Sequence, residues 1–116
     1  MDKQDMTVRE LVNAAIKFRD ERDWKQFHNP KDLAISLSLE ASELLENFQW
    51  KDSETSIKEN QKNIHEELAD VVIYSLMLSD MLDVDLNDIV LDKLEKNAKK
   101  YPVDKAKGNW KKYTDL

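Results

Sequence analysis

The sequence contains no cysteine, one glycine and two prolines among its 116 residues. The absence of cysteine excludes disulfides, thiolate metal sites and cysteine nucleophiles. So few glycines and prolines leave few places for tight turns, which argues against a strand-rich fold. The N-terminal segment has no apolar core of the signal-peptide kind, and no apolar run approaches the roughly 18 residues of a membrane span. We therefore expect one cytoplasmic domain over residues 1–116 that does not associate with membranes.

Basic charge is also scarce, since 18 lysines and arginines face 24 acids and leave a net charge of −6. A nucleic-acid polymer is therefore not an expected partner, because such binding needs a basic face. The charge is nevertheless uneven: acids dominate the middle of the chain and lysines its last quarter. This polarity fits either an acidic metal site beside a basic phosphate site or ordinary solvated surface. The clustered lysines are Lys93, Lys96, Lys99, Lys100, Lys105, Lys107, Lys111 and Lys112.

Apolar periodicity and capping signals predict an all-α fold of four helices. The expected helices span residues 7–22, 30–48, 56–82 and 86–100. Their boundaries rest on capping boxes at Thr7 and Ser56, the Asn29-Pro30 pair, the cap Asp85 and the stop at Pro102. The polar tail, residues 103–116, is expected to be mobile without a ligand.

The second and third predicted helices are apolar around most of their circumference. The stretches are Leu33–Leu45 and Leu68–Leu82. A helix that is apolar all round is buried on all sides, and 116 residues offer too little material to cover two of them. We therefore expect a homodimer, with a dimer of dimers as a further possibility. The alternative is a monomeric bundle with several exposed leucines.

Two pairs of carboxylates lie inside these apolar stretches. Glu40 and Glu43 lie in the second predicted helix, and Glu67 and Asp70 in the third. The i, i+3 spacing places each pair on one helical face. Burying unpaired carboxylates is costly, and two like charges 4 Å apart repel by about 4 kcal/mol at an effective dielectric constant of 20. Mg²⁺ or Mn²⁺ would neutralise them; lysine or arginine side chains are the alternative.

A di-iron site of the ferritin kind is not expected. Such a bundle uses Glu-x-x-His motifs, and neither His28 nor His65 has a glutamate three residues before it. Glu46 and Glu66, which neighbour the two acid pairs, are interpreted as surface acids.

The spacing of the four acids resembles a known family. Glu40-x-x-Glu43, 23 intervening residues and Glu67-x-x-Asp70 resemble the motif of the MazG-like all-α nucleoside triphosphate pyrophosphohydrolases. The segments at 18–50 and 93–102, the run EELADVVIYSL and the closing KKYTDL are similar to the dCTP pyrophosphatase branch. The resemblance extends from Phe18 to the C-terminus.

This resemblance implies a fold, an activity and a set of site residues. The fold is a four-helix unit that forms dimers or tetramers. The implied activity is Mg²⁺-dependent hydrolysis of a nucleoside triphosphate, a pyrimidine deoxynucleotide such as dCTP or a modified form, to the monophosphate and pyrophosphate. This reaction would clear noncanonical nucleotides from the pool. Glu40, Glu43, Glu67 and Asp70 would be catalytic and would hold the Mg²⁺. The substrate-binding residues would be Trp24, Phe27, His28, Trp50 and Tyr74 for base and sugar. They would also include Lys93, Asn97 and Lys100, which would either face the phosphates or help to order the acidic residues, and Lys112 and Tyr113, which would close over the triphosphate.

Some of these roles can be compared with simpler ones from the residues themselves. Tyr74 follows Asp70 by four positions and so shares the face of the acids, which favours a pocket role. Trp24 and Phe27 would otherwise seal the corner between the first two helices. His28 would otherwise be an exposed loop residue.

Two other functions compete with the enzyme. One is a non-catalytic helical dimer that binds a protein partner, and the other is a metal-dependent hydrolase of a different nucleotide, such as ADP-ribose or a nucleoside diphosphate. All four inward-facing acids are present, which favours an enzyme over a binding module.

Overall fold

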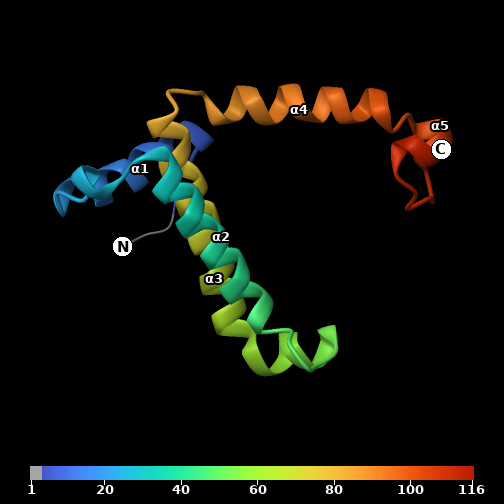
Figure 1. The fold of residues 1–116 in the computed structure, drawn as a ribbon, viewed down its shortest axis with the longest axis horizontal. Helices are drawn as coiled ribbons and strands as arrows, with labels where there is room; N and C mark the ends of the chain where they lie inside the picture. Colours follow the sequence, from blue (N-terminus) through green and yellow to red (C-terminus); the bar gives the residue numbers. More distant parts are fainter. Residues whose placement is uncertain (1–3) are drawn as a thin grey trace. The chain divides into compact units, whose positions relative to one another are not determined.

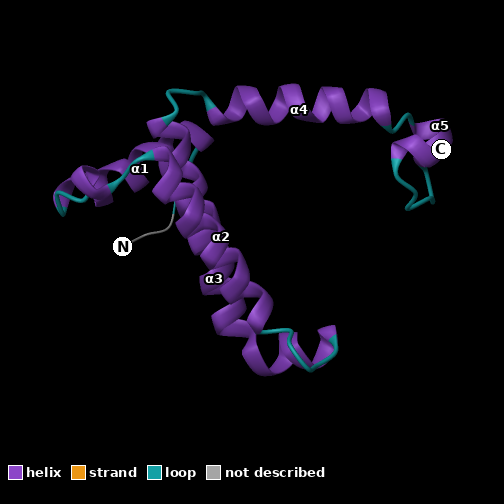
Figure 2. Ribbon diagram, in the orientation of Figure 1, coloured by secondary structure: helices purple, strands orange, loops and turns teal. Residues whose placement is uncertain are grey.

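The computed structural model describes residues 4–116, and this range contains helices and connecting segments without any strand (Figure 2). The predicted all-α class is therefore confirmed. The chain divides into a unit that ends at Val84 and a second unit, Asp85–Leu116. The α-helices are α1 (Val8–Glu21), α2 (Pro30–Glu46), α3 (Ser53–Met81), α4 (Leu86–Lys100) and α5 (Val103–Ala106), and the 3₁₀ turns are η1 (Lys25–Phe27) and η2 (Tyr113–Asp115).

The first two helices begin where their caps predict. The side-chain oxygen of Thr7 accepts a hydrogen bond from the backbone N–H of Glu10 at 3.1 Å, and the Glu10 carboxylate accepts one from the Thr7 N–H at 3.1 Å. The Asn29 side chain caps α2 by accepting from the Asp32 N–H at 2.9 Å. These bonds satisfy N–H groups that have no partner within the helix.

The predicted start of α3 at Ser56 is wrong by three residues. Asp52 is the N-cap, and its carboxylate accepts from the Thr55 N–H at 2.8 Å. Ser56 lies one turn inside the helix and is completely buried. A carboxylate at this position both bonds the free N–H and complements the helix dipole, so Asp52 caps α3 in preference to Ser56.

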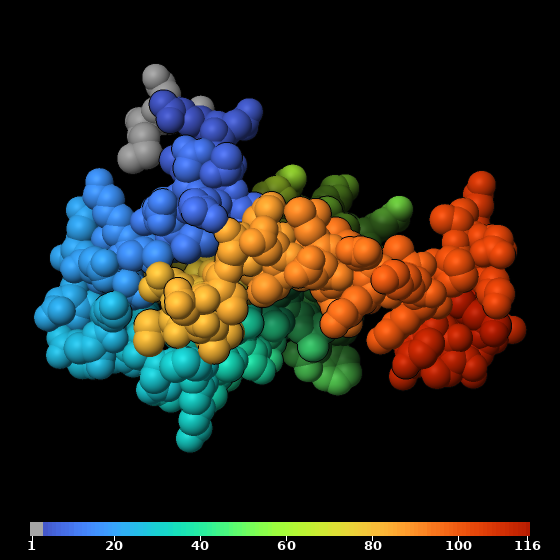
Figure 3. All heavy atoms as spheres, turned by 90° about the horizontal axis from the view of Figure 1, so that it is seen from above, coloured from blue at the N-terminus to red at the C-terminus, as the bar shows by residue number. Residues whose placement is uncertain are grey.

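Within the first unit, α2 and α3 lie side by side as an antiparallel hairpin (Figure 1). α1 packs against α3 near the end of that hairpin (Figures 1 and 3). The hairpin places the middle of α2 opposite the middle of α3. The buried apolar side chains of residues 4–116 are only Ala15, Leu33, Leu76 and Met77.

A buried ion pair joins α1 to α3. The Arg19 side chain is 2% exposed, and its guanidinium donates to Asp20 and to Asp80, each at 2.9 Å. Asp20 is its neighbour in sequence, whereas Asp80 lies 61 positions away near the end of α3. The sequence analysis did not anticipate this contact.

Large apolar side chains remain exposed on α2 and α3 of the single chain. Their exposed fractions run from 38% to 69%, for Ile35, Leu39, Leu45, Leu68, Val72 and Ile73. None of the helices in the described range combines the length and apolar character needed to cross a bilayer, including the 29-residue α3.

In the second unit, α4 has its predicted bounds. The Asp85 carboxylate accepts from the Asp88 N–H at 3.2 Å, and the helix ends at Lys100, shortly before Pro102. The tail folds back within this unit, because the rings of Tyr101 and Tyr113 meet edge to face with centroids 5.9 Å apart. Whether the tail moves in the absence of a ligand stays a prediction.

Candidate active site

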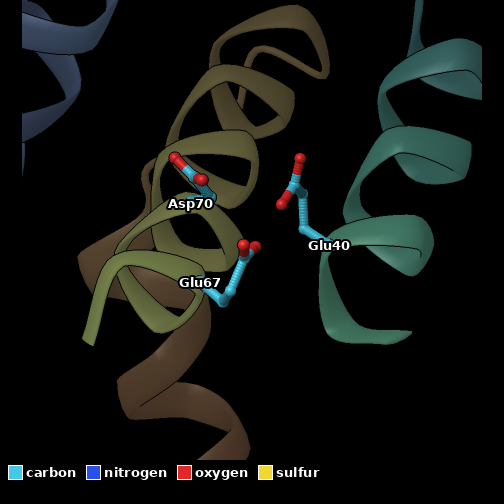
Figure 4. Close-up of side chains that lie close together, drawn as sticks. All are labelled: Glu40, Glu67 and Asp70. Atoms are coloured by element: carbon cyan, nitrogen blue, oxygen red, sulfur yellow. The ribbon is translucent and has the colours of Figure 1, made fainter. Parts of the chain in front are cut away.

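Three of the four predicted acids meet between α2 and α3. Figure 4 shows Glu40 of α2 pointing across the hairpin toward Glu67 and Asp70 of α3. One carboxylate oxygen from each of them lies within 4.8 Å of the other two. Glu43 is exposed and outside this group of oxygens, but its charge helps to raise the pKa of Glu40. The antiparallel hairpin therefore joins acids that are 27 to 30 positions apart in sequence.

The acids strongly influence one another. Burial, hydrogen bonding with Glu67 and Glu43, and the charges of Glu43 and Asp70 raise the pKa of Glu40 to about 7. The pKa of Glu67 is also raised: its hydrogen bond with Glu40 lowers it, but desolvation and the neighbouring carboxylates outweigh that effect. Within residues 4–116, no lysine or arginine forms an ion pair with Glu40, Glu67 or Asp70. Basic side chains in this range therefore do not neutralise the cluster by direct pairing.

Two buried oxygens of the cluster lack a hydrogen-bond donor. They are Oε2 of Glu40 and Oε2 of Glu67, and neither is bonded by any group in the described part of the chain. Leaving such oxygens ionised and unpaired is unfavourable. A proton on Glu40, donated to Glu67, relieves this at low pH, and a divalent cation would relieve it at higher pH. Clustered carboxylate oxygens are hard ligands, so these residues fit Mg²⁺ or Mn²⁺.

An apolar cavity of about 430 Å³ opens beside Asp70. Among the residues predicted to contact the base and sugar, Trp24, His28 and Tyr74 line it. The remaining lining comes largely from apolar faces of α1 and α3, including Leu11, Ala14, Ala15, Phe18, Ile73 and Met77. The sequence analysis did not single out these residues, which lie within the predicted helices 7–22 and 56–82. A weak sequence signal was available in α1, because Ala14 and Ala15 both line the cavity and their small side chains leave space that larger ones would fill.

Two polar side chains at this cavity, His28 and Tyr74, are neutral near pH 7. Burial and the charge of Arg19 lower the pKa of His28, so its imidazole is uncharged. Burial and the nearby Glu40, Asp70 and Glu43 raise the pKa of Tyr74, so its hydroxyl remains a donor. Apolar walls with a few neutral polar groups are suited to an uncharged, flat heterocycle.

The indole of Trp24 is held at the cavity by its neighbours. It meets Phe18 edge to face with ring centroids 5.6 Å apart. The Arg22 guanidinium lies 3.8 Å from the centroid of the Phe18 ring. These contacts hold Trp24 and Phe18 together as one wall of the cavity.

Comparison with known proteins agrees with this geometry. The model of the MazG-like family matches residues 35–116, which is most of the chain. The chain belongs to the MazG-like family. The dCTP pyrophosphatase 1 proteins of Mus musculus and Homo sapiens are 39% and 38% identical to it over 115 residues, covering 95% of this chain and 68% of each relative. The crystal structure of a pyrophosphatase from Archaeoglobus fulgidus superimposes with a TM-score of 0.77 at 39% identity, covering 88% of this chain and 98% of the other.

These matches confirm the predicted family and its enzyme class, the nucleoside triphosphate pyrophosphohydrolases. Two predicted aromatic residues of this MazG-like chain, however, do not line the cavity. Phe27 is 67% exposed, and Trp50 is 93% exposed with a left-handed φ of 67°. A contact of either residue with the base stays a prediction.

The predicted phosphate-binding residues of this MazG-like chain all belong to the second unit. Lys93, Asn97 and Lys100 recur at i, i+4 and i+7 on α4 and so share one helical face. The Lys100 ammonium lies 4.9 Å from the centroid of the Tyr113 ring, which connects α4 to the tail. Lys112 immediately precedes Tyr113. Their approach to the phosphates stays a prediction.

Proposed function

We propose that this MazG-like enzyme hydrolyses a nucleoside triphosphate between its α- and β-phosphates and releases the monophosphate and pyrophosphate. Glu40, Glu43, Glu67 and Asp70 are assigned as catalytic residues that hold Mg²⁺, for which Mn²⁺ can substitute. The observation that carries the proposal is the convergence of three carboxylates, two of them with unbonded buried oxygens, beside an apolar cavity. A nucleotide with its base in the cavity would present its phosphates near Asp70.

Mg²⁺ bound at these acids would neutralise phosphate oxygens and orient the leaving pyrophosphate. The protein itself supplies position and charge. Glu43 lies beside the other three acids and remains solvent-accessible, so besides its role as a ligand we assign it to orient the attacking water. Tyr74 offers a neutral hydroxyl next to the cluster, and the apolar cavity excludes water from the base. Phosphoryl transfer depends mainly on such positioning and electrostatics, so no serine or cysteine nucleophile is required.

The proposed substrate is a pyrimidine deoxynucleoside triphosphate, either dCTP or a modified form. The relatives named dCTP pyrophosphatase 1 support this choice, as does a cavity whose wall carries Trp24 for stacking. We propose that the enzyme removes such nucleotides from the cytoplasmic pool. Lys93, Asn97, Lys100, Lys112 and Tyr113 are assigned to the phosphates.

A homodimer, or a dimer of dimers, is proposed as the working assembly. Only four apolar side chains are buried in the described part of the single chain, whereas Leu39 and Leu45 of α2 and Leu68 of α3 are more than half exposed. A second copy that covered these faces would complete the core in the way expected for an obligate interface.

A pyrophosphate-release assay over standard and modified NTPs and dNTPs, with Mg²⁺ and with EDTA, tests the proposed reaction. We expect release with Mg²⁺, fastest for dCTP or a modified pyrimidine form, and none with EDTA, because the acids cannot neutralise phosphate charge by themselves. The monophosphate should appear in equal amount. Release of inorganic phosphate instead, or no turnover of any nucleotide, would contradict the proposal.

The raised pKa of Glu40 predicts how the stability of the metal-free protein changes with pH. Between the ordinary value of 4.5 and about 7, the folded state holds a proton that the unfolded state has released. The contribution of Glu40 to the free energy of unfolding is therefore complete below 4.5 and is lost as pH rises through 7. The stabilisation that a bound cation gives should instead increase as pH rises, because the cation displaces this proton.

Melting temperatures in EDTA and in Mg²⁺, between about pH 5 and pH 8, measure both trends. In EDTA, the melting temperature of Glu40→Gln should rise relative to that of the wild type as pH rises. In the wild type, the stabilisation that Mg²⁺ gives should grow over the same range. A pH-independent difference between the two proteins would contradict the assigned pKa.

A further inference from the structure

Three asparagines connect the end of α2 to α3. The side chain of Asn47, the C-cap of α2, is buried with 7% exposure. Its Oδ1 accepts a hydrogen bond from Nδ2 of Asn63 at 2.8 Å. Its backbone carbonyl accepts another from Nδ2 of Asn60 at 3.0 Å. We call Asn47, Asn60 and Asn63 the asparagine clamp.

The clamp is joined to the backbone beside the acids. Nδ2 of Asn47 donates to the carbonyl of Glu43 at 3.2 Å and to that of Leu44 at 3.3 Å. The Asn47 amide therefore has partners for both its oxygen and its nitrogen. The Asn47 side chain therefore links Asn63 of α3 to the backbone carbonyl of Glu43 in α2.

The clamp and the acids share one seam between the helices. On α2, the spacing i, i+3, i+7 places on one face Glu40, Glu43 and Asn47. On α3, the spacing i, i+4, i+7 places on one face Asn63, Glu67 and Asp70. Because the helices are antiparallel, the bond between Asn47 and Asn63 lies about one helical turn from the level of Glu43 and Glu67.

The backbone of α3 also departs from helical geometry at the clamp. Asn60 has φ −116° and ψ 21°, so α3 consists of two helical segments that meet there. The hydrogen bond that Asn60 donates to the Asn47 carbonyl joins α3 to α2 at this break. Asn63 lies at the start of the second segment, which carries the acids. The position of that segment on α2 therefore depends on contacts after Asn60.

We infer that the asparagine clamp positions the metal site by fixing the register of α2 on the second segment of α3. Leucine-rich seams pack acceptably in more than one register, and a buried asparagine with a hydrogen-bonded partner, here Asn47 with Asn63, can select one of them. A slip by one residue moves a side chain by about 1.5 Å along the helix and turns it by about 100°. That shift would separate Glu40 from Glu67 and Asp70. The inference rests on the proposed function, because it concerns the same acids.

Asn63→Ala tests the clamp, with Gln61→Ala on the same helix as its matched control. Asn63 is exposed, so the variant should fold, and alanine favours the helix. Binding of Mn²⁺ to each protein without nucleotide is measured from the electron paramagnetic resonance signal of free Mn²⁺. We expect Asn63→Ala to bind Mn²⁺ about tenfold more weakly, as for other residues that orient metal ligands, and Gln61→Ala to match the wild type.

Activity gives a second readout. The Mg²⁺ concentration for half-maximal rate should rise in Asn63→Ala, whereas kcat at saturating Mg²⁺ should stay near the wild-type value. Asn63→Gln, which keeps the amide, should recover part of the affinity. A lower melting temperature with unchanged Mn²⁺ affinity would assign the clamp to stability alone and overturn the inference. Failure of the wild type itself to bind Mn²⁺ would instead remove the metal site, and the inference with it.

Discussion

Asp70→Asn and Glu40→Gln will each lower the rate of pyrophosphate release at least about 100-fold, the scale at which single groups that stabilise transition-state charge act. Each substitution keeps the shape of the side chain but removes one of the three carboxylates that converge between α2 and α3. The measurement is the initial rate of pyrophosphate release at saturating Mg²⁺, together with helical content from circular dichroism, which should not change.

A stability measurement separates loss of the site from loss of the fold. The three carboxylates repel one another without metal, so Glu40→Gln should raise the melting temperature in EDTA while it abolishes the further rise that Mg²⁺ gives to the wild type. Glu46→Gln is the control, because this exposed acid lies on α2 and has the same chemistry. Retained activity in both Asp70→Asn and Glu40→Gln would disprove the metal assignment.

Asp80→Asn will destabilise the protein by about 3 kcal/mol, the lower end of the range for removing one partner of a buried ion pair. The Arg19 side chain is 2% exposed and would keep only Asp20 as a charged partner. The lower end applies because the Asp80 side chain is itself 33% exposed, so water already screens part of the interaction. Urea unfolding at fixed protein concentration measures the change.

Asp20→Asn is the matched control for this ion pair. The Asp20 side chain is 52% exposed, so its contribution should stay below about 1 kcal/mol, as for surface pairs. The double variant Arg19→Met, Asp80→Leu should recover much of the stability, because an apolar pair avoids the cost of desolvating charge. Equal effects of Asp20→Asn and Asp80→Asn would contradict the view that Asp80 is the partner that matters.

Local signals determined most helix boundaries. Thr7, Asn29 and Asp85 begin their helices as predicted, because an N-cap bond involves residues only three positions apart. The start of α3 differed because both Asp52 and Ser56 are capping residues. Asp52 is the cap because its carboxylate also complements the helix dipole, and the burial of Ser56 one turn inside α3 is a tertiary property that the sequence did not show.

The four candidate acids of the site were also predictable from local signals in the sequence. Their i, i+3 spacing within apolar stretches is visible in the sequence, and the family resemblance joined the two pairs. The cavity was harder to predict, because Leu11, Ala15 and Phe18 have the same periodicity whether a helix face packs against a core or lines a pocket. Only the placement of α1 against α3 showed that this face is partly hollow.

The sequence by itself therefore determined α1, α2, α4 and most of α3, the all-α class, the MazG-like family and the candidate acids, because each depends on spacing along one chain segment. The tertiary structure decided which acids meet, which side chains line the cavity, and that Arg19 pairs with Asp80 and Asn47 with Asn63. Those contacts join residues 16 to 61 positions apart across two helices. Their partners are set by the rotation and register of each helix on its neighbour, which no local pattern specifies.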